Sequence, residues 1–249
     1  MRAINYQIIT DFKIGINWLK SGWVVFKYNP LTWIATLLTI IVCLGLLNNF
    51  FIGKFIAMIV APYFAGGVYL NLHQSNQGNN ISFLGLFSAL NSDYNKQLLL
   101  LGVMGTVVVL LDYAFHHFSF FTQQMQHIDS RTQRSLDSSF SLGGALSWLI
   151  HTMWGIALSF CVPLVVLRHA KTLPALKLSI VAVLHNIPAL LVYYIMVMIL
   201  LFISIIPVGL GLFISLPVIF CASYFVFSAI FTDENNQTTT EKTLEDYKK

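Results

Sequence analysis

PALLVYYIMVMILLFISII, the sequence of residues 188–206, decides the fold class because it contains no charged residue. A helix needs roughly 17–25 mostly apolar residues to cross the hydrocarbon core of a bilayer, which is about 30 Å thick. Five other segments of the chain have the same length and character. The sequence therefore predicts an all-α membrane protein with six transmembrane helices, at about residues 31–52, 55–72, 98–118, 145–167, 188–206 and 209–231.

The composition agrees with a chain that is mostly inside a membrane. Hydrophobic residues make up 57% of the sequence and charged residues 10%, whereas a soluble domain is about 25% charged. The mean hydropathy is +0.73. We expect one transmembrane domain over residues 1–231, followed by a disordered cytoplasmic tail over residues 232–249, which are rich in Asn, Gln, Thr and charge.

Lysine and arginine residues predict the orientation of the spans, because positive charge accumulates on the cytoplasmic side. With a cytoplasmic N-terminus, the inner segments hold 11 of the 14 Lys and Arg residues. The outer segments hold Lys54, Arg131 and Arg134. The bias predicts a multi-pass protein of the bacterial inner membrane, with both termini in the cytoplasm.

Residues 12–28 precede the first span and have the pattern of an amphipathic helix lying in the membrane interface. Its expected apolar face recurs every three or four residues and comprises Phe12, Ile16, Leu19, Trp23 and Phe26. Lys13, Lys20 and Lys27 recur every seven residues on another face. This pattern predicts a helix in the membrane plane and not a seventh span, because charge at the bilayer centre costs about 2.5–3.5 kcal/mol per residue.

The same plan recurs twice along the chain. Short amphipathic segments at 81–91 and 173–186 precede the third and fifth spans, and each even span carries one proline: Pro62, Pro163 or Pro217. A proline frees a helix carbonyl that lipid cannot satisfy, so we expect these prolines to face protein. The pattern predicts three repeated units, each an amphipathic helix followed by a two-span hairpin.

Several tryptophan, glycine and proline positions support a resemblance to a known family. They are Trp18, Gly22, Trp23, Phe26, Pro30, Trp33, Pro62, Ala65, Gly66, Gly67, Pro163, Leu164, Val165, Ala175, Leu176 and Ser179. Over about residues 12–231 the chain resembles an uncharacterised family of bacterial six-helix inner-membrane proteins. That family is distantly similar to the membrane domain attached to some glycerophosphodiester phosphodiesterases. The resemblance implies a six-span bundle in the inner membrane, and it implies no catalytic residues and no cofactor.

Asp112 is the sharpest candidate site residue, because an ionisable group inside a span is costly and has a partner or a function. His116 lies four residues on, on the same helix face, and His151 lies at similar depth on the fourth span. The sequence leaves three interpretations open. One is a structural Asp112–His151 hydrogen-bonded pair, another a proton or ion relay, and the third a Zn or Cu site at Asp112, His116 and His151. The structural pair is favoured, since no HExxH or CxxC spacing supports a metal.

A second set of residues is expected to contact anionic lipid headgroups at the cytoplasmic face. Tryptophans are enriched at membrane interfaces, and clusters of lysine and arginine bind acidic lipids. The set comprises Lys13, Lys20, Lys27, Trp18, Trp23, Arg168 and Lys171. The accumulation of positive charge on the cytoplasmic side also explains the basic members without any lipid site.

The sequence favours a non-enzymatic integral membrane protein, an accessory or scaffold subunit that contacts another membrane protein or lipid. It contains no P-loop, no dinucleotide fingerprint and no recognisable nucleophile arrangement, and nothing in it indicates nucleic-acid binding. Apart from the region of Asp112, the spans lack the ionisable groups of an ion-coupled pathway. The alternatives are a transporter of a lipid or small amphiphile, and a metal- or cofactor-binding membrane protein.

The predicted orientation can be tested by labelling intact cells. Cysteines introduced at Ser130 and Ser138 should react with a membrane-impermeant thiol reagent, because both positions are expected on the outer, periplasmic side of the membrane. The labelled protein is detected on a gel. Reaction of a cysteine placed in the 73–97 loop, with none at the two outer positions, would reverse the orientation.

Overall fold

The computed structural model describes residues 6–9, 11, 13–77, 79, 81–91, 93–129 and 142–231, with side chains described up to residue 115 and again from residue 144. This part of the chain is helical and contains no strand. Its elements are α1 (Ile14–Tyr28), α2 (Pro30–Asn48), α3 (Phe51–Asn76), the 3-10 helix η1 (Phe83–Asn91), α4 (Asn95–Asp129), α5 (Leu142–Leu158), α6 (Cys161–Arg168), α7 (Thr172–His185), α8 (Ile187–Ile205) and α9 (Leu212–Ile230).

Six helical segments in the described part are long and apolar enough to cross a bilayer, which confirms the predicted fold class. They are α2, α3, residues 95–115 of α4, residues 144–168 of α5 and α6, α8 and α9. Each coincides with one predicted span to within a few residues. The backbone of α4 continues as helix to Asp129, so residues 119–129 of the segment expected outside the bilayer are helical.

The order of elements confirms the three repeated units. The short helices α1, η1 and α7 each precede a pair of spans: α2 and α3, then α4 and α5–α6, then α8 and α9. Pro62, Pro163 and Pro217 lie in the second span of their pairs, and all three are buried in protein as predicted. The position of α1, η1 and α7 in the membrane interface stays a prediction.

In each pair of spans, the second span is more deeply buried within the protein, and it is called the inner span below. The buried share is 44% for α3, 44% for α5–α6 and 56% for α9, against 17% for α2, 22% for α4 and 28% for α8. The apolar residues of α2, α4 and α8 that face outward are therefore available to lipid. The protein core lies among the three inner spans, in which Phe160 of the α5–α6 break contacts Phe227 and Phe231 at the end of α9.

The break between α5 and α6 shows how the inner spans are stabilised by the next unit. The helix is interrupted at residues 159–160, three residues before Pro163. The Phe160 N–H donates to the hydroxyl oxygen of Ser179 on α7 at 3.0 Å, and Ser179 donates to the Ile156 carbonyl at 3.2 Å. Ser179 is completely buried, and its side chain pairs with the Phe160 N–H that lipid would leave unpaired. The Ile156 carbonyl also accepts from the Ser159 N–H at 3.3 Å.

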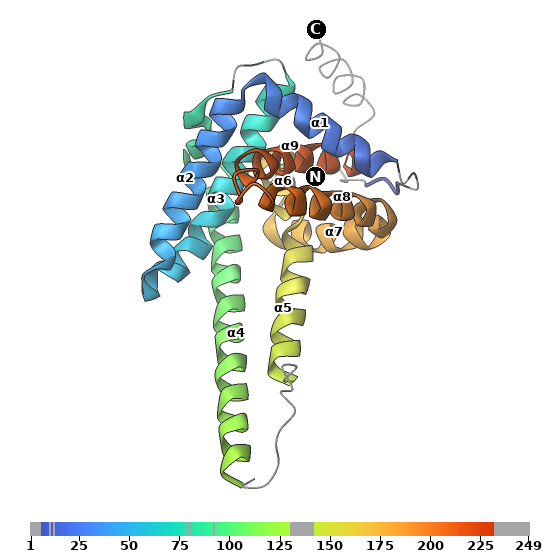
Figure 1. Ribbon diagram of the computed structural model, residues 1–249. Coiled ribbons are helices and arrows are strands. Elements are labelled where there is room, and N and C mark those ends of the chain that lie inside the picture. The colour runs from blue at the N-terminus through green and yellow to red at the C-terminus, as the bar shows by residue number, and fades with distance from the viewer. Residues whose placement is uncertain are drawn as a thin grey trace.

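The short helices connect the units in cyclic order. η1 packs on α3 of the unit before it, α7 packs on α5 and α6 of the unit before it, and α1 packs on α8 and α9 of the last unit. In Figure 1, α1 lies across the α8–α9 pair, whereas α4 and α5 run side by side away from the other helices. The first helix of the chain therefore completes the packing of its last unit.

Two glycines bring α1 close to the backbones of α8 and α9. A Cβ atom added at Gly22 would lie 2.6 Å from the Ala222 backbone nitrogen, and one at Gly15 would lie 2.9 Å from the Tyr193 nitrogen. Between them, Trp18 packs edge-on against the Tyr193 ring, with 6.0 Å between ring centroids. The residues that are buried along α1 are Gly15, Trp18, Gly22, Val25 and Phe26.

Most of the apolar face predicted for residues 12–28 lies on the side of α1 that does not pack on protein. Ile16 and Trp23, which belong to the predicted face, are exposed at 38% and 45%, and only Phe26 of that face is fully buried. Phe12 lies outside the described residues. Glycines determine the side of α1 that packs on α8 and α9, because they permit the closest approach of two helices. That the apolar face contacts the membrane stays a prediction.

Residues 7–9, before α1, are hydrogen-bonded to the last unit as well. The Ile9 N–H donates to the side-chain oxygen of Asn186 at 2.8 Å, and the Asn186 amide donates to the Gln7 carbonyl at 3.1 Å. The Gln7 N–H donates to the Ile230 carbonyl at the end of α9, at 2.8 Å. Asn186 is completely buried, so residues 7–9 and α1 attach to the last unit together.

Substitution of Gly22 by alanine tests the contact between α1 and α9. The added methyl group would meet backbone atoms of α9 that cannot rotate away, so we expect a loss of about 1–3 kcal/mol in the free energy of unfolding. Thermal unfolding of the purified protein in detergent measures it. Gly45→Ala is the matched control, because a Cβ there meets no atom within 4 Å and alanine favours helix by about 1 kcal/mol. Equal melting temperatures for the two variants would contradict the packing.

Candidate functional site

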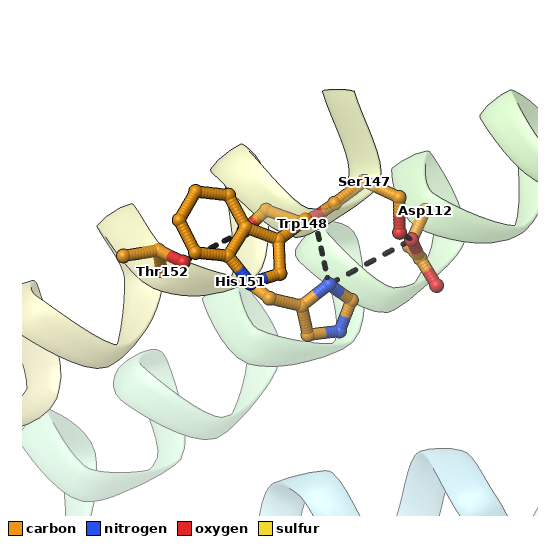
Figure 2. A network of polar contacts seen from close by, with 5 residues as sticks. All are labelled: Asp112, Ser147, Trp148, His151 and Thr152. Atoms are coloured by element: carbon orange, nitrogen blue, oxygen red, sulfur yellow. Dashed lines mark hydrogen bonds and ion pairs between the residues drawn. The ribbon is translucent and has the colours of Figure 1, made fainter. Parts of the chain in front are cut away.

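Asp112 on α4 faces two residues of α5, one of which the sequence analysis did not identify. The Ser147 hydroxyl donates a hydrogen bond to the Asp112 carboxylate, as Figure 2 shows. The His151 Nδ1 atom lies 3.7 Å from the nearer Asp112 oxygen and 3.1 Å from the Ser147 carbonyl oxygen. The direct partner of Asp112 is therefore Ser147, and His151 completes the cluster one helical turn further along α5.

Burial shows that this cluster lies at the edge of the helix pair. Ser147 is 7% exposed, whereas the side chains of Asp112 and His151 are 22% and 53% exposed. A carboxylate that accepts a hydrogen bond from a hydroxyl group has a partner without any ligand. This arrangement agrees with a structural role, and the alternative of a proton relay stays a prediction.

The predicted metal site cannot be assembled from the side chains that the structure describes. Among them, no group of three His, Cys, Asp or Glu residues lies close enough to hold a metal ion. His116 belongs to the α4 backbone, but its side chain lies outside the described part. A Zn or Cu site at Asp112, His116 and His151 therefore stays a prediction.

The predicted lipid-contacting residues of α1 lie on different sides of the helix. Lys13, Lys20 and Lys27 are exposed. Trp23 is 45% exposed, whereas Trp18 is 5% exposed and contacts Tyr193. The expectation that Trp18 contacts headgroups is wrong. Gly15 and Gly22 allow the side of α1 that carries Trp18 to pack closely on α8 and α9.

A groove follows the outward side of α1. Its volume is about 620 Å³, and its lining is mostly apolar. The lining residues are Ile16, Asn17, Leu19, Lys20, Ser21, Trp23 and Val24 of α1, together with Leu200 of α8 and Val218 of α9. The groove therefore combines an apolar floor with the ammonium group of Lys20.

Arg168 and Lys171 lie at the ends of two helices. Lys171 is exposed at the start of α7, where it is available to solvent or headgroups. Arg168 is the last residue of α6, and its guanidinium group donates to the carbonyl oxygen of Phe231 at the end of α9. A cation at the C-terminal end of a helix is stabilised by the helix dipole. Arg168 therefore links two inner spans.

Arg168 also lines a polar cavity at the point where all three inner spans end. The cavity volume is about 220 Å³. Its lining residues are His73 and Gln77 from the end of α3, Leu167 and Arg168 from α6, and Tyr224, Phe227 and Ser228 from α9. Each of the three repeated units thus contributes its second span to one cavity.

The polar side chains of this cavity form a chain of hydrogen bonds. The Gln77 amide nitrogen lies 3.0 Å from His73 Nε2, and His73 Nδ1 lies 3.0 Å from the Tyr224 hydroxyl. If the Gln77 amide donates, His73 Nε2 accepts and its Nδ1–H donates to Tyr224. A neighbouring bond joins the hydroxyl of Tyr69 to that of Ser223, at 3.2 Å.

The sequence analysis missed this cavity except for Arg168. The signal was present, because the last turns of the second and sixth spans carry polar residues at corresponding depth: His73 and Gln77 in one, Tyr224 and Ser228 in the other. Spans of even number end on the same side of a membrane. Polar residues at the ends of even spans could therefore have been grouped before the structure was known.

No family model, curated protein or solved structure matches the chain. The resemblance to bacterial six-helix inner-membrane proteins thus stays a prediction. The same is true of the more distant similarity to phosphodiesterase membrane domains.

Variants of the Asp112 cluster test its structural role. Ser147→Ala removes the donor to Asp112 and should lower the free energy of unfolding by about 1 kcal/mol. Asp112→Asn should be mild, since the amide oxygen still accepts the hydroxyl proton, whereas Asp112→Leu should cost roughly 1–3 kcal/mol through the unpaired Ser147. Thermal unfolding in detergent measures all three. Equal stability of the Asn and Leu variants would argue against the pair.

Proposed function

We propose that this multi-pass membrane protein is a non-enzymatic lipid-binding accessory or scaffold protein of a bacterial inner membrane, with both termini in the cytoplasm. Its six apolar helices support a position within the bilayer, and the lysine and arginine bias supports the orientation. The observation that carries the proposal is the groove along α1, which combines apolar walls with Lys20. The proposed ligand is an anionic phospholipid.

The chemistry of the groove matches the two parts of such a lipid. Ile16, Leu19 and Trp23 offer apolar surface to an acyl chain, together with Leu200. Lys20 offers a positive charge to the headgroup, and the exposed Lys13 and Lys27 lie one heptad to either side of it. Lysine near a membrane surface attracts anionic lipid by about 1 kcal/mol per residue.

The polar cavity among the inner spans favours a second candidate function, transport of a lipid or small amphiphile. Binding sites of transporters often lie at the interface between structural repeats. Here the three repeats meet at His73, Arg168 and Tyr224. The cavity opens at the ends of the spans and not at their middle, which makes lipid binding the better supported of the two functions.

Native mass spectrometry with phosphatidylglycerol tests the proposed lipid site. Lys20→Gln should weaken binding of this lipid roughly fivefold, because about 1 kcal/mol of headgroup attraction is lost. Lys177→Gln is the matched control, since Lys177 is an exposed lysine on α7 and does not line the groove. An equal loss in both variants, or no loss in Lys20→Gln, would contradict the proposed site.

A further inference from the structure

The polar cavity at the ends of the three inner spans has the chemistry of an anion site. We propose that it binds a phosphate group. This proposal does not depend on the lipid groove, because it uses a different set of residues on α3, α6 and α9. The phosphate can belong to free inorganic phosphate or to the headgroup of a phospholipid, and the chemistry that would recognise it is the same.

The charge of the cavity favours an anion. Arg168 carries the positive charge, and no carboxylate is among the described residues that line the cavity. A guanidinium group has five N–H donors in a planar fork that matches the oxygens of phosphate. The hydrogen bond from Arg168 to the Phe231 carbonyl holds the guanidinium group at the C-terminal end of α9.

The number and direction of polar groups favour phosphate over a planar carboxylate. The Gln77 amide comes from α3, the Arg168 guanidinium from α6, and the Tyr224 and Ser228 hydroxyls from α9. Groups from three helices surround the cavity from different sides. A tetrahedral ligand has acceptor oxygens in several directions, whereas the two oxygens of a carboxylate lie in one plane with its carbon.

The size and walls of the cavity fit a small charged group. Its volume of about 220 Å³ is below the roughly 300–1,000 Å³ of sites for drug-sized ligands. Leu167 and Phe227 supply apolar walls on two sides. Apolar walls reduce contact with water, and a charge-assisted hydrogen bond is stronger there than in bulk solvent.

The near-isosteric change Gln77→Glu places a negative charge in the cavity and tests the proposal. A carboxylate at this position can only accept, so the hydrogen bond to His73 is reversed: the Nε2–H of His73 donates to it, and His73 Nδ1 accepts from the Tyr224 hydroxyl. Gln74→Glu is the matched control, because Gln74 is exposed one turn earlier on α3 and does not line the cavity. Arg168→Lys is a less clean test, since Arg168 also links α6 to α9.

The measurement is the melting temperature of the full chain in detergent during titration. One series uses sodium phosphate against sodium chloride at equal ionic strength, and the other uses phosphatidylglycerol against an uncharged diacylglycerol. We expect a saturable rise in melting temperature in the wild type and in Gln74→Glu. The half-saturating concentration should increase at least tenfold in Gln77→Glu.

The two series distinguish the sources of the phosphate. A rise with sodium phosphate identifies the free ion. A rise with phosphatidylglycerol alone identifies the headgroup if Lys20→Gln keeps the rise and Gln77→Glu weakens it, because the groove along α1 can bind the same lipid. Lys20→Gln should behave as the wild type when sodium phosphate is the ligand, so failure of the lipid groove and failure of this site are separable. The proposal is overturned if neither ligand stabilises the protein, or if Gln77→Glu and Gln74→Glu respond alike.

Discussion

The fold depends on the requirement that every backbone polar group inside a bilayer finds a partner within the protein. Six helices meet this requirement through their own hydrogen bonds, except where a proline or a break interrupts them. Those interruptions lie in the inner spans, where protein can replace the missing partners. Ser179 of α7 is the clearest case, because it pairs with both sides of the α5–α6 break. The spans that a proline or a break interrupts therefore lie inside the bundle, and the uninterrupted spans lie outside.

The same requirement explains why each short helix packs on a neighbouring unit. A two-span hairpin whose inner helix contains a proline is incomplete without polar or close-packed contacts from elsewhere. η1 supplies these contacts to α3, α7 to α5–α6, and α1 to α8 and α9. The polar cavity is a consequence of this arrangement, because the inner spans converge at the ends from which His73, Arg168 and Tyr224 extend.

Much of the fold could be predicted from the sequence, because long apolar runs and their prolines are local features. The six spans, the three repeated units and the burial of Pro62, Pro163 and Pro217 are confirmed. The side of α1 that packs on protein was not predicted, since the importance of Gly15 and Gly22 depends on a partner about 170–200 residues away. Ser147 and the cavity were missed for a similar reason. A serine or histidine near the end of a span becomes informative only when its neighbour on another helix is known.

The position of α1 has a consequence for the order in which the chain can assemble during synthesis. Its docking surface includes Ala222 and Val218, which leave the ribosome about 200 residues after Gly22. At 5–20 residues per second, this delay lasts roughly 10–40 s. During that time the tryptophans and lysines of α1 must be accommodated elsewhere, and a helix with this pattern is suited to the membrane surface. α1 thus reaches its place only after α9 has been synthesised.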